Sequence, residues 1–279
     1  MRRRRLRLAA IPAYWHLLSL DAPTVAVVWA WSFARAAQVH ASAISLAVLG
    51  IGTWLIYVAD RLLDGRPGSP RNELRERHVF HARHQRPLLV AAAVAGAALM
   101  ALIVLMPAPA RRDDTILFGF LLAYFLAVHL PPLRIRFPRE LVVGLMFASA
   151  CAVPAWSQSG ASHERLRWIV PLFAALCWLN CRAIAFWEQE APRRSWIAAS
   201  ALALAVAAGV LAVLTGSPAI LRLAIAVLAS TMLLFAVDRD RRRALRRSSS
   251  DAPLSPLALR VLADASLLTP VLLLIPWRL

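Results

Sequence analysis

The stretch Ile56–Asp64, with the sequence IYVADRLLD, closes an apolar run that begins near residue 42. The run is long enough to cross a hydrocarbon core about 30 Å thick as an α-helix. Asp60 and Asp64 are four residues apart, so they lie on one face of such a helix, about 40° apart around its axis. Because charge is costly at this depth, the two acids indicate a functional site. A divalent cation that carries a phosphate is one natural ligand for two carboxylates.

Apolar segments of this kind recur along the whole chain. Apolar residues make up 60% of the 279 residues and the mean hydropathy is +0.61, which is typical of integral membrane proteins. We predict an all-α integral membrane bundle of about nine transmembrane helices. It forms a single polytopic domain over residues 1–279, because no segment between the helices is long enough to fold separately. The expected spans are roughly 18–36, 42–63, 87–107, 114–131, 140–157, 167–187, 195–215, 218–237 and 257–277.

The positive charge of the chain indicates its partner and its orientation. A net charge of +17, carried by arginine without any lysine, suits either nucleic acid or an anionic membrane surface. The arginines fall between apolar segments and form no separate basic domain, which favours membrane lipid over nucleic acid. With the N-terminus inside, about 23 of the 32 arginines lie on or beside inner segments, as the positive-inside rule requires. We therefore expect an N-in, C-out protein of the bacterial inner membrane.

Two inner loops are long enough to have a role of their own. Residues 65–86 predict a cytoplasmic cap: turn formers come first, and 72–84 then predict a short helix whose apolar contacts are Leu74, Val79 and Phe80. Three histidines recur there at i, i+3 and i+6, and four nearby arginines favour a solvated or phosphate-facing surface over a metal site: His78, His81 and His84. Residues 238–256, rich in arginine and then serine, predict a solvated basic loop at the lipid surface.

Three polar clusters fall on the same predicted inner face. They occupy residues 60–64, 129–144 and 180–190, at the inner ends of the second, fourth and sixth expected spans. Acidic groups from two helices bind Mg²⁺ readily, and arginines from a third neutralise a diphosphate. The three clusters together therefore predict a magnesium-diphosphate site.

With these clusters the chain resembles the UbiA superfamily of intramembrane aromatic prenyltransferases. Those proteins have nine spans and Asp-rich motifs at the inner ends of helices two and six. Their first motif usually reads Asn-Asp-x-x-Asp-x-x-x-Asp. Laid over this chain, its last two acids match Asp60 and Asp64, while Ile56 and Tyr57 replace the leading Asn and Asp.

The second motif and the basic segment extend the resemblance. Laid over residues 180–188, the second motif matches Asn180 and places Glu188 at its final acidic position, with Cys181 and Ile184 at the other two. The proline-containing basic segment that follows helix four in the family is similar to 131–144, which holds Arg134 and Arg136.

The resemblance implies a role for each matched residue. Catalysis and Mg²⁺ binding would fall to Asp60, Asp64 and Glu188, and diphosphate contacts to Arg61, Arg134, Arg136 and Asn180. The substrates would be a prenyl diphosphate and an apolar or aromatic acceptor, held in a dry chamber with aromatic walls at Trp54, Tyr57 and Trp187. Membrane lipid is the other expected partner, and the sequence indicates no protein partner.

Alternatives stay open at this point. Three acids stand where the family commonly offers six, so either the arginines replace part of the metal or catalysis has been lost. A non-catalytic UbiA-like protein that binds a lipid or quinone-like ligand is the main alternative, and a transporter is a weaker one. These acids and arginines are also typical of the charged residues at which a transmembrane span leaves the membrane, without any further function. Asp264 lies inside the last expected span, where we expect an ion pair with Arg260 one turn away.

Overall fold

The computed structural model describes residues 11–64, 76–129, 139–158, 160–188, 196–247 and 254–274. All regular structure in these ranges is helical. A short helix, Ile11–Leu17, comes first. It is followed by α2 (Asp21–Ala37), α3 (Ala43–Asp64), α4 (Glu76–Arg83), α5 (Gln85–Leu105), α6 (Ala108–His129), α7 (Arg139–Trp156), α8 (Gly160–Leu166), α9 (Ile169–Trp187), α10 (Ile197–Leu214), α11 (Pro218–Arg247), α12 (Pro256–Ser266) and the 3₁₀ helix η2 (Thr269–Leu274).

The chain is an all-helical integral membrane protein. Within the described ranges, six helices are long and apolar enough to cross a membrane: α3, α5, α7, α9, α10 and α11. Ile11–Leu17 and α2 count as a seventh span when taken together, although the chain bends by 90° between them. Two expected spans are not among these. The helix α12 has only 11 residues, about half of what a membrane crossing needs, and α6 does not meet the same test.

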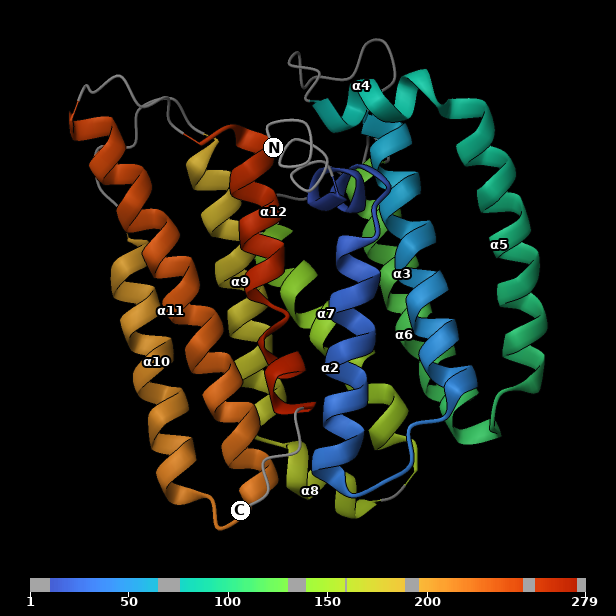
Figure 1. Ribbon diagram of the computed structural model, residues 1–279. Helices are drawn as coiled ribbons and strands as arrows, with labels where there is room; N and C mark the ends of the chain where they lie inside the picture. The colour runs from blue at the N-terminus through green and yellow to red at the C-terminus, as the bar shows by residue number, and fades with distance from the viewer. Residues whose placement is uncertain are drawn as a thin grey trace, which may run out of the picture.

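The described helix ends that flank the arginine-rich connections of the sequence gather at one end of the bundle. Helices α3, α9 and α11 finish there, α7 and α12 begin there, and α4 lies across it (Figure 1). This end, called the arginine-rich end below, is the one the sequence predicts as inner. The opposite end carries α8 and the turn between α10 and α11 (Figure 1).

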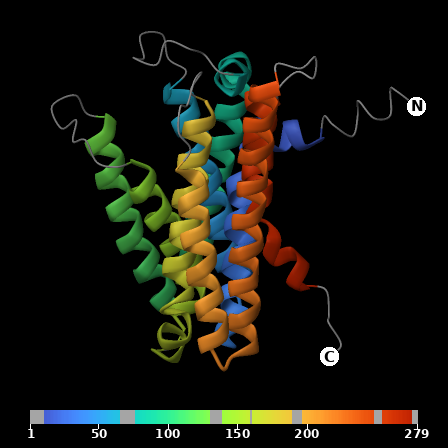
Figure 2. The same ribbon diagram turned by 90° about the vertical axis from the view of Figure 1, so that its left-hand side faces the viewer.

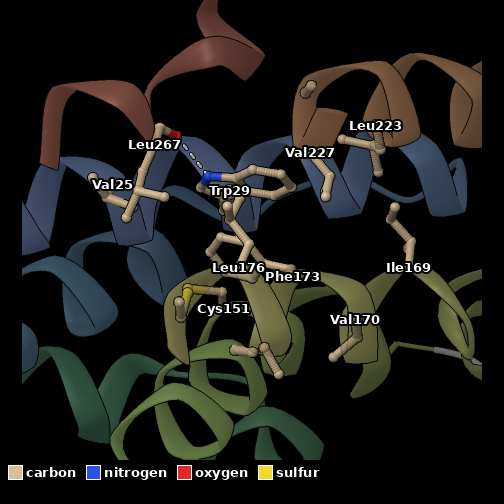
Figure 3. Packing of buried hydrophobic residues seen from close by; sticks show 14 of the residues in the cluster. Val25, Trp29, Cys151, Ile169, Val170, Phe173, Leu176, Leu223, Val227 and Leu267 are labelled. Atoms are coloured by element: carbon tan, nitrogen blue, oxygen red, sulfur yellow. Dashed lines mark hydrogen bonds between the residues drawn. The ribbon is translucent and has the colours of Figure 1, made fainter. Parts of the chain in front are cut away.

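The core lies between α2, α7, α9, α11 and α12. Trp29 on α2 is fully buried, stacks on Phe173 of α9 with ring centroids 3.9 Å apart, and donates its indole N–H to the carbonyl of Leu267 over 2.8 Å (Figure 3). A residue as large as tryptophan fits here because alanines fill much of the surrounding helix faces. At Gly144 on α7 an added Cβ would lie 2.9 Å from the Ala174 carbonyl oxygen on α9, so glycine permits this close approach.

Helix α6 stands apart from this core. It leans away from the other helices and packs mainly against α7 (Figure 2). Its contact with the bundle is therefore narrow, and a groove remains between α6 and α7.

The prediction of a basic loop over residues 238–256 is wrong for residues 238–247, which are helical. Helix α11 continues through Asp238 to Arg247. Ion pairs along the helix support this extension: Asp238 pairs with Arg242 over 2.8 Å at i, i+4, and Asp240 pairs with Arg243 at i, i+3. Arg241 also donates to the Trp187 carbonyl over 2.7 Å, which satisfies a free acceptor at the end of α9.

The predicted short helix within 72–84 is confirmed as α4, but its buried face is a different one. Val79 is 49% exposed, whereas His81 is fully buried. The Nε2 atom of His81 lies 3.2 Å from the Ser19 hydroxyl, so α4 packs onto the bend before α2. The solvated surface predicted for the histidines does not hold at this residue. Leu74 lies outside the described residues.

Candidate functional site

The bend between Ile11–Leu17 and α2 brings polar side chains into the bundle. At the bend Ser19 has φ 61°, a left-handed conformation that is uncommon for a residue other than glycine. The chain then turns by 90° into α2, and Trp54 of α3 donates to the Leu18 carbonyl over 3.0 Å. As a result His16 and Asp21, which flank the bend, both face inward and are both 2% exposed.

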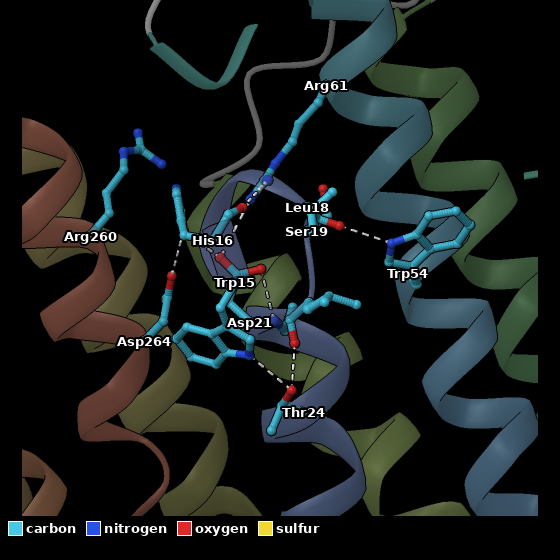
Figure 4. Close-up of polar contacts among 12 residues, drawn as sticks. Trp15, His16, Leu18, Ser19, Asp21, Thr24, Trp54, Arg61, Arg260 and Asp264 are labelled. Carbon is cyan, nitrogen blue, oxygen red and sulfur yellow. Dashed lines mark hydrogen bonds and ion pairs between the residues drawn. The ribbon is translucent and has the colours of Figure 1, made fainter. Parts of the chain in front are cut away.

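Five polar residues from five elements meet at this point, and Figure 4 shows four of them: His16, Asp21, Arg61 and Asp264. The Nδ1 atom of His16 lies 2.5 Å from Asp21 Oδ2 and 3.4 Å from Asp264 Oδ2 of α12. Asn180 of α9 donates to Asp264 Oδ1 over 3.2 Å. The fifth residue is Arg61 of α3. We call His16, Asp21, Arg61, Asn180 and Asp264 the buried polar cluster.

Arg61 is the cation of the buried polar cluster. It is 5% exposed, donates through Nη1 to the His16 carbonyl over 2.6 Å, and places Nη2 3.4 Å from Asp21 Oδ2. The resemblance to the UbiA superfamily predicts that Arg61 contacts a diphosphate. In the structure its described partners are the bend and Asp21, so it ties α3 to the start of α2.

Asp60 points in another direction. Successive residues on a helix differ by about 100°, and Asp60 faces α7, where Arg139 donates to its Oδ1 over 3.1 Å. Both side chains are about one third exposed, at 34% and 37%. The residues of the Ile56–Asp64 stretch therefore contribute to two different sites. Arg61 belongs to the buried polar cluster, and Asp60 belongs to an accessible ion pair at the arginine-rich end.

A second ion pair stands beside the first. Glu140 follows Arg139 at the start of α7, and its Oε1 lies 3.7 Å from Nη1 of Arg182 on α9. These two side chains are also partly exposed. We call Asp60, Arg139, Glu140 and Arg182 the inner ion-pair row, which links α3, α7 and α9.

Glu188, the third predicted acid, is paired with Arg260 of α12. Both side chains are mostly buried. This corrects the expectation that Arg260 would pair with Asp264, because Asp264 contacts Asn180 and His16 instead. Among the described residues, Asp60 and Glu188 are held in separate ion pairs.

The rest of the predicted site has a mixed outcome. Arg134 and Arg136 lie outside the described residues, as does the side chain of Asp64, the last residue of α3. Of the predicted aromatic walls, Trp187 is buried and donates to Asp238 over 3.1 Å. Trp54 lines an open apolar groove of about 400 Å³ on α2, α3 and α5.

A second open groove runs between α6 and α7. It has a volume of about 440 Å³ and is lined on α7 by Leu145, Met146, Ser149, Val153 and Trp156, and on α6 by Asp113, Ile116, Leu117 and Phe120. Residues seven apart on a helix lie within about 20° of each other. Arg139, Met146 and Val153 therefore lie on one stripe of α7, with Arg139 two helical turns before Met146 of the groove.

Comparison with protein-family models, with curated proteins and with solved structures found no match to this chain. The geometry of the chain itself therefore carries the functional argument.

The sequence pattern did not predict the buried polar cluster. A signal was present, because His16 and Asp21 interrupt an apolar stretch and Asp264 lies within another. The 90° bend that joins them is not encoded in any spacing. Arg139 and Glu140 were within a predicted cluster, but no pattern distinguished them from ordinary span-end charges.

Proposed function

We propose that the chain is a membrane prenyltransferase that moves a prenyl group from a prenyl diphosphate to an apolar or aromatic acceptor. In this proposal it has the nine-span UbiA-like architecture, in the bacterial inner membrane, with its N-terminus and arginine-rich end in the cytoplasm and its C-terminus outside. The observation that carries the proposal is the accessible Asp60–Arg139 ion pair, in which Arg139 lies on the same stripe of α7 as the groove residue Met146, two helical turns before it.

The inner ion-pair row supplies the charges that a diphosphate needs. Arg139 and Arg182 are partly exposed guanidinium groups, which bind phosphate oxygens in a two-pronged geometry. In the free protein each is held by a carboxylate. A diphosphate would take over the arginines and release Asp60 and Glu140. Arg134 and Arg136 precede Arg139 by only five and three residues, and they remain proposed contacts.

The released carboxylates suit Mg²⁺. Asp60 and Glu140 offer the hard oxygen ligands that this ion prefers, and Asp64 and Glu188 remain proposed ligands from the family resemblance. Bound Mg²⁺ would neutralise part of the charge of the diphosphate.

The α6–α7 groove supplies a place for the prenyl chain. Its lining is mostly apolar, and its volume of about 440 Å³ falls within the range of small-ligand pockets. A chain lying along Met146 and Val153 would have its diphosphate at Arg139, one end of the same stripe. The lipid-facing opening of the groove would let the substrate enter from the bilayer.

The chemistry then follows from where the charge develops. The allylic carbon–oxygen bond breaks, and the diphosphate leaves with the electron pair. Arg139 and Arg182 stabilise the growing negative charge by preformed electrostatic interactions. The acceptor forms a bond to the allylic carbon and gives up one proton, which completes the transfer.

A second candidate is a non-catalytic protein that holds a lipid or quinone-like molecule in the same groove. One observation favours it: Asp60, Glu140 and Glu188 are each already paired with an arginine, so the described site is balanced without a metal ion. In that case the ligand would bind without Mg²⁺ and the acids would serve packing.

The test is binding of prenyl diphosphates of several chain lengths to the purified full chain in nanodiscs, with and without Mg²⁺. We expect micromolar affinity for wild type with Mg²⁺. Asp60→Asn and Arg139→Gln should each weaken binding at least about tenfold, because each removes one charged contact worth about 1.5–3 kcal/mol.

The matched control is Arg167→Gln. Arg167 forms an exposed ion pair with Glu164 over 2.8 Å near α8, at the opposite end of the bundle. This variant should bind like wild type. Tight binding that needs neither Mg²⁺ nor Asp60 would favour the non-catalytic candidate. Failure of folded wild type to bind any chain length would contradict the prenyltransferase proposal.

A further inference from the structure

We propose that His16, Asp21 and Asp264, with Asn180, bind one divalent transition-metal ion inside the bundle. This site is separate from the proposed magnesium-diphosphate site, because it lies on the Arg61 side of α3 whereas Asp60 faces α7. The proposal does not depend on the proposed function.

The ligand atoms are close enough for a single ion. One ring nitrogen of His16 and one carboxylate oxygen each of Asp21 and Asp264 all lie within 4.8 Å of one another. With metal–ligand bonds of about 2.1 Å, neighbouring ligands on one ion are about 3.0–3.4 Å apart. The His16–Asp264 separation of 3.4 Å already matches this range. His16 and Asp21, 2.5 Å apart, would need to separate by about 0.5–1 Å, which is the change from a hydrogen bond to two metal bonds.

The charges of the buried polar cluster leave room for a cation. Asp21 and Asp264 contribute two negative charges, which one divalent ion would match, and Arg61, which also bonds the His16 carbonyl, contributes one positive charge. Two carboxylates with oxygens within 4.8 Å of each other are costly in a largely buried place such as this unless a cation lies between them. Glu188, at the end of α9, and Arg260 of α12 neutralise each other.

An unpartnered acceptor favours a metal ion over a proton at this place. Asn180 is 5% exposed and its Oδ1 has no hydrogen-bond partner among the described residues, although its amide contacts Asp264. One proton bridges two acceptors at most, whereas a metal ion accepts lone pairs from four or more. A half-turn of the Asn180 amide would place its oxygen 3.2 Å from Asp264 Oδ1, the spacing of two ligands on one ion.

The donor set indicates the class of metal. One imidazole, two carboxylates and an amide oxygen suit Zn²⁺, Mn²⁺, Fe²⁺ or Co²⁺ better than Mg²⁺ or Ca²⁺, which prefer oxygen ligands alone. Arg61 would act from outside the ligand set, since its contact with Asp21 fixes the orientation of that carboxylate. Asp264 is the most accessible member, with a side chain 18% exposed, and it marks the open side of the site.

The experiment uses the full chain in nanodiscs, stripped with a chelator and then reloaded with Zn²⁺ or Co²⁺. Elemental analysis should find about one ion per chain, and Co²⁺ should give visible absorption bands of a site with nitrogen and oxygen ligands. His16→Gln and Asp264→Asn should each lower metal affinity by more than about tenfold, the minimum seen even for residues that only support a ligand. Glu164→Gln, an exposed acid near α8, is the matched control and should keep the wild-type stoichiometry.

Wild-type protein that stays folded and binds no Zn²⁺ or Co²⁺ would overturn the proposal, as would unchanged metal content in folded Asp264→Asn. Asp264→Asn keeps the size of the side chain, so it tests the site even where His16→Gln fails to fold. Binding of prenyl diphosphate by the stripped protein would leave the proposed function standing whatever the metal result.

Discussion

The substitution Arg61→Gln tests whether the arginine of the IYVADRLLD stretch acts in folding. Its guanidinium lies 3.4 Å from Asp21 and bonds the His16 carbonyl over 2.6 Å, and it is 5% exposed. Removing one partner of a buried ion pair costs about 3–5 kcal/mol, because the other charge stays buried without compensation. This is a large part of the total stability of about 5–15 kcal/mol that folded proteins have.

Asp60→Asn, at the neighbouring position, is the matched comparison. Its ion pair with Arg139 is about one third exposed, so the loss should be at most about 1 kcal/mol. At about 2–4 °C per kcal/mol, Arg61→Gln should lower the melting temperature by roughly 6–20 °C and Asp60→Asn by less than about 4 °C. Thermal unfolding in one detergent, followed by size-exclusion of the heated protein, measures both.

The double variant Asp21→Asn/Arg61→Gln separates charge from packing. It removes the uncompensated carboxylate, so it should recover part of the stability lost in Arg61→Gln. Equal melting temperatures for Arg61→Gln and Asp60→Asn would refute the reasoning. So would a double variant less stable than Arg61→Gln alone, because the two residues would then not be acting as a pair.

Two further predictions concern helix packing. Gly144→Ala should destabilise the protein by about 1–3 kcal/mol, because its Cβ would lie 2.9 Å from backbone atoms of α9. The measurement compares its melting temperature with that of Gly96→Ala, a glycine with open space around it. Trp29→Phe should cost about 1–3 kcal/mol, since it leaves the buried carbonyl of Leu267 without a donor; chemical denaturation in detergent measures it. A Gly144→Ala variant as stable as Gly96→Ala, or a Trp29→Phe variant as stable as wild type, would contradict the packing described.

Hydropathy and charge predicted much of the fold. Apolar runs such as 42–63 and 195–215 correspond to α3 and α10 with ends within a few residues. A run of apolar residues without a break has only one stable form in lipid, the helix, so its position can be predicted from composition. The predicted end of a helix was wrong where charged residues were interpreted as a loop. Helix α11 continues through Asp238, because Asp238 pairs with Arg242 on the same helix.

The site was harder to predict for a different physical reason. Asp60 and Arg61 are adjacent in the sequence, but their directions differ by about 100°, and only tertiary packing decides that one meets Arg139 and the other meets Asp21. His16 entered the bundle through a bend that no periodicity encodes. The pattern therefore predicted which residue types matter at the end of α3, and the fold decided what each of them contacts.

The most direct test of the central claim is photo-crosslinking with a prenyl diphosphate that carries a diazirine at the end of its chain. In the presence of Mg²⁺, we predict labelled peptides from residues 116–120 of α6 and 145–153 of α7, with labelling lost on addition of unlabelled prenyl diphosphate. Labelling should also be lost in Arg139→Gln. Competed labelling confined to the groove on α2, α3 and α5, or labelling that unlabelled prenyl diphosphate does not displace, would contradict the proposed site.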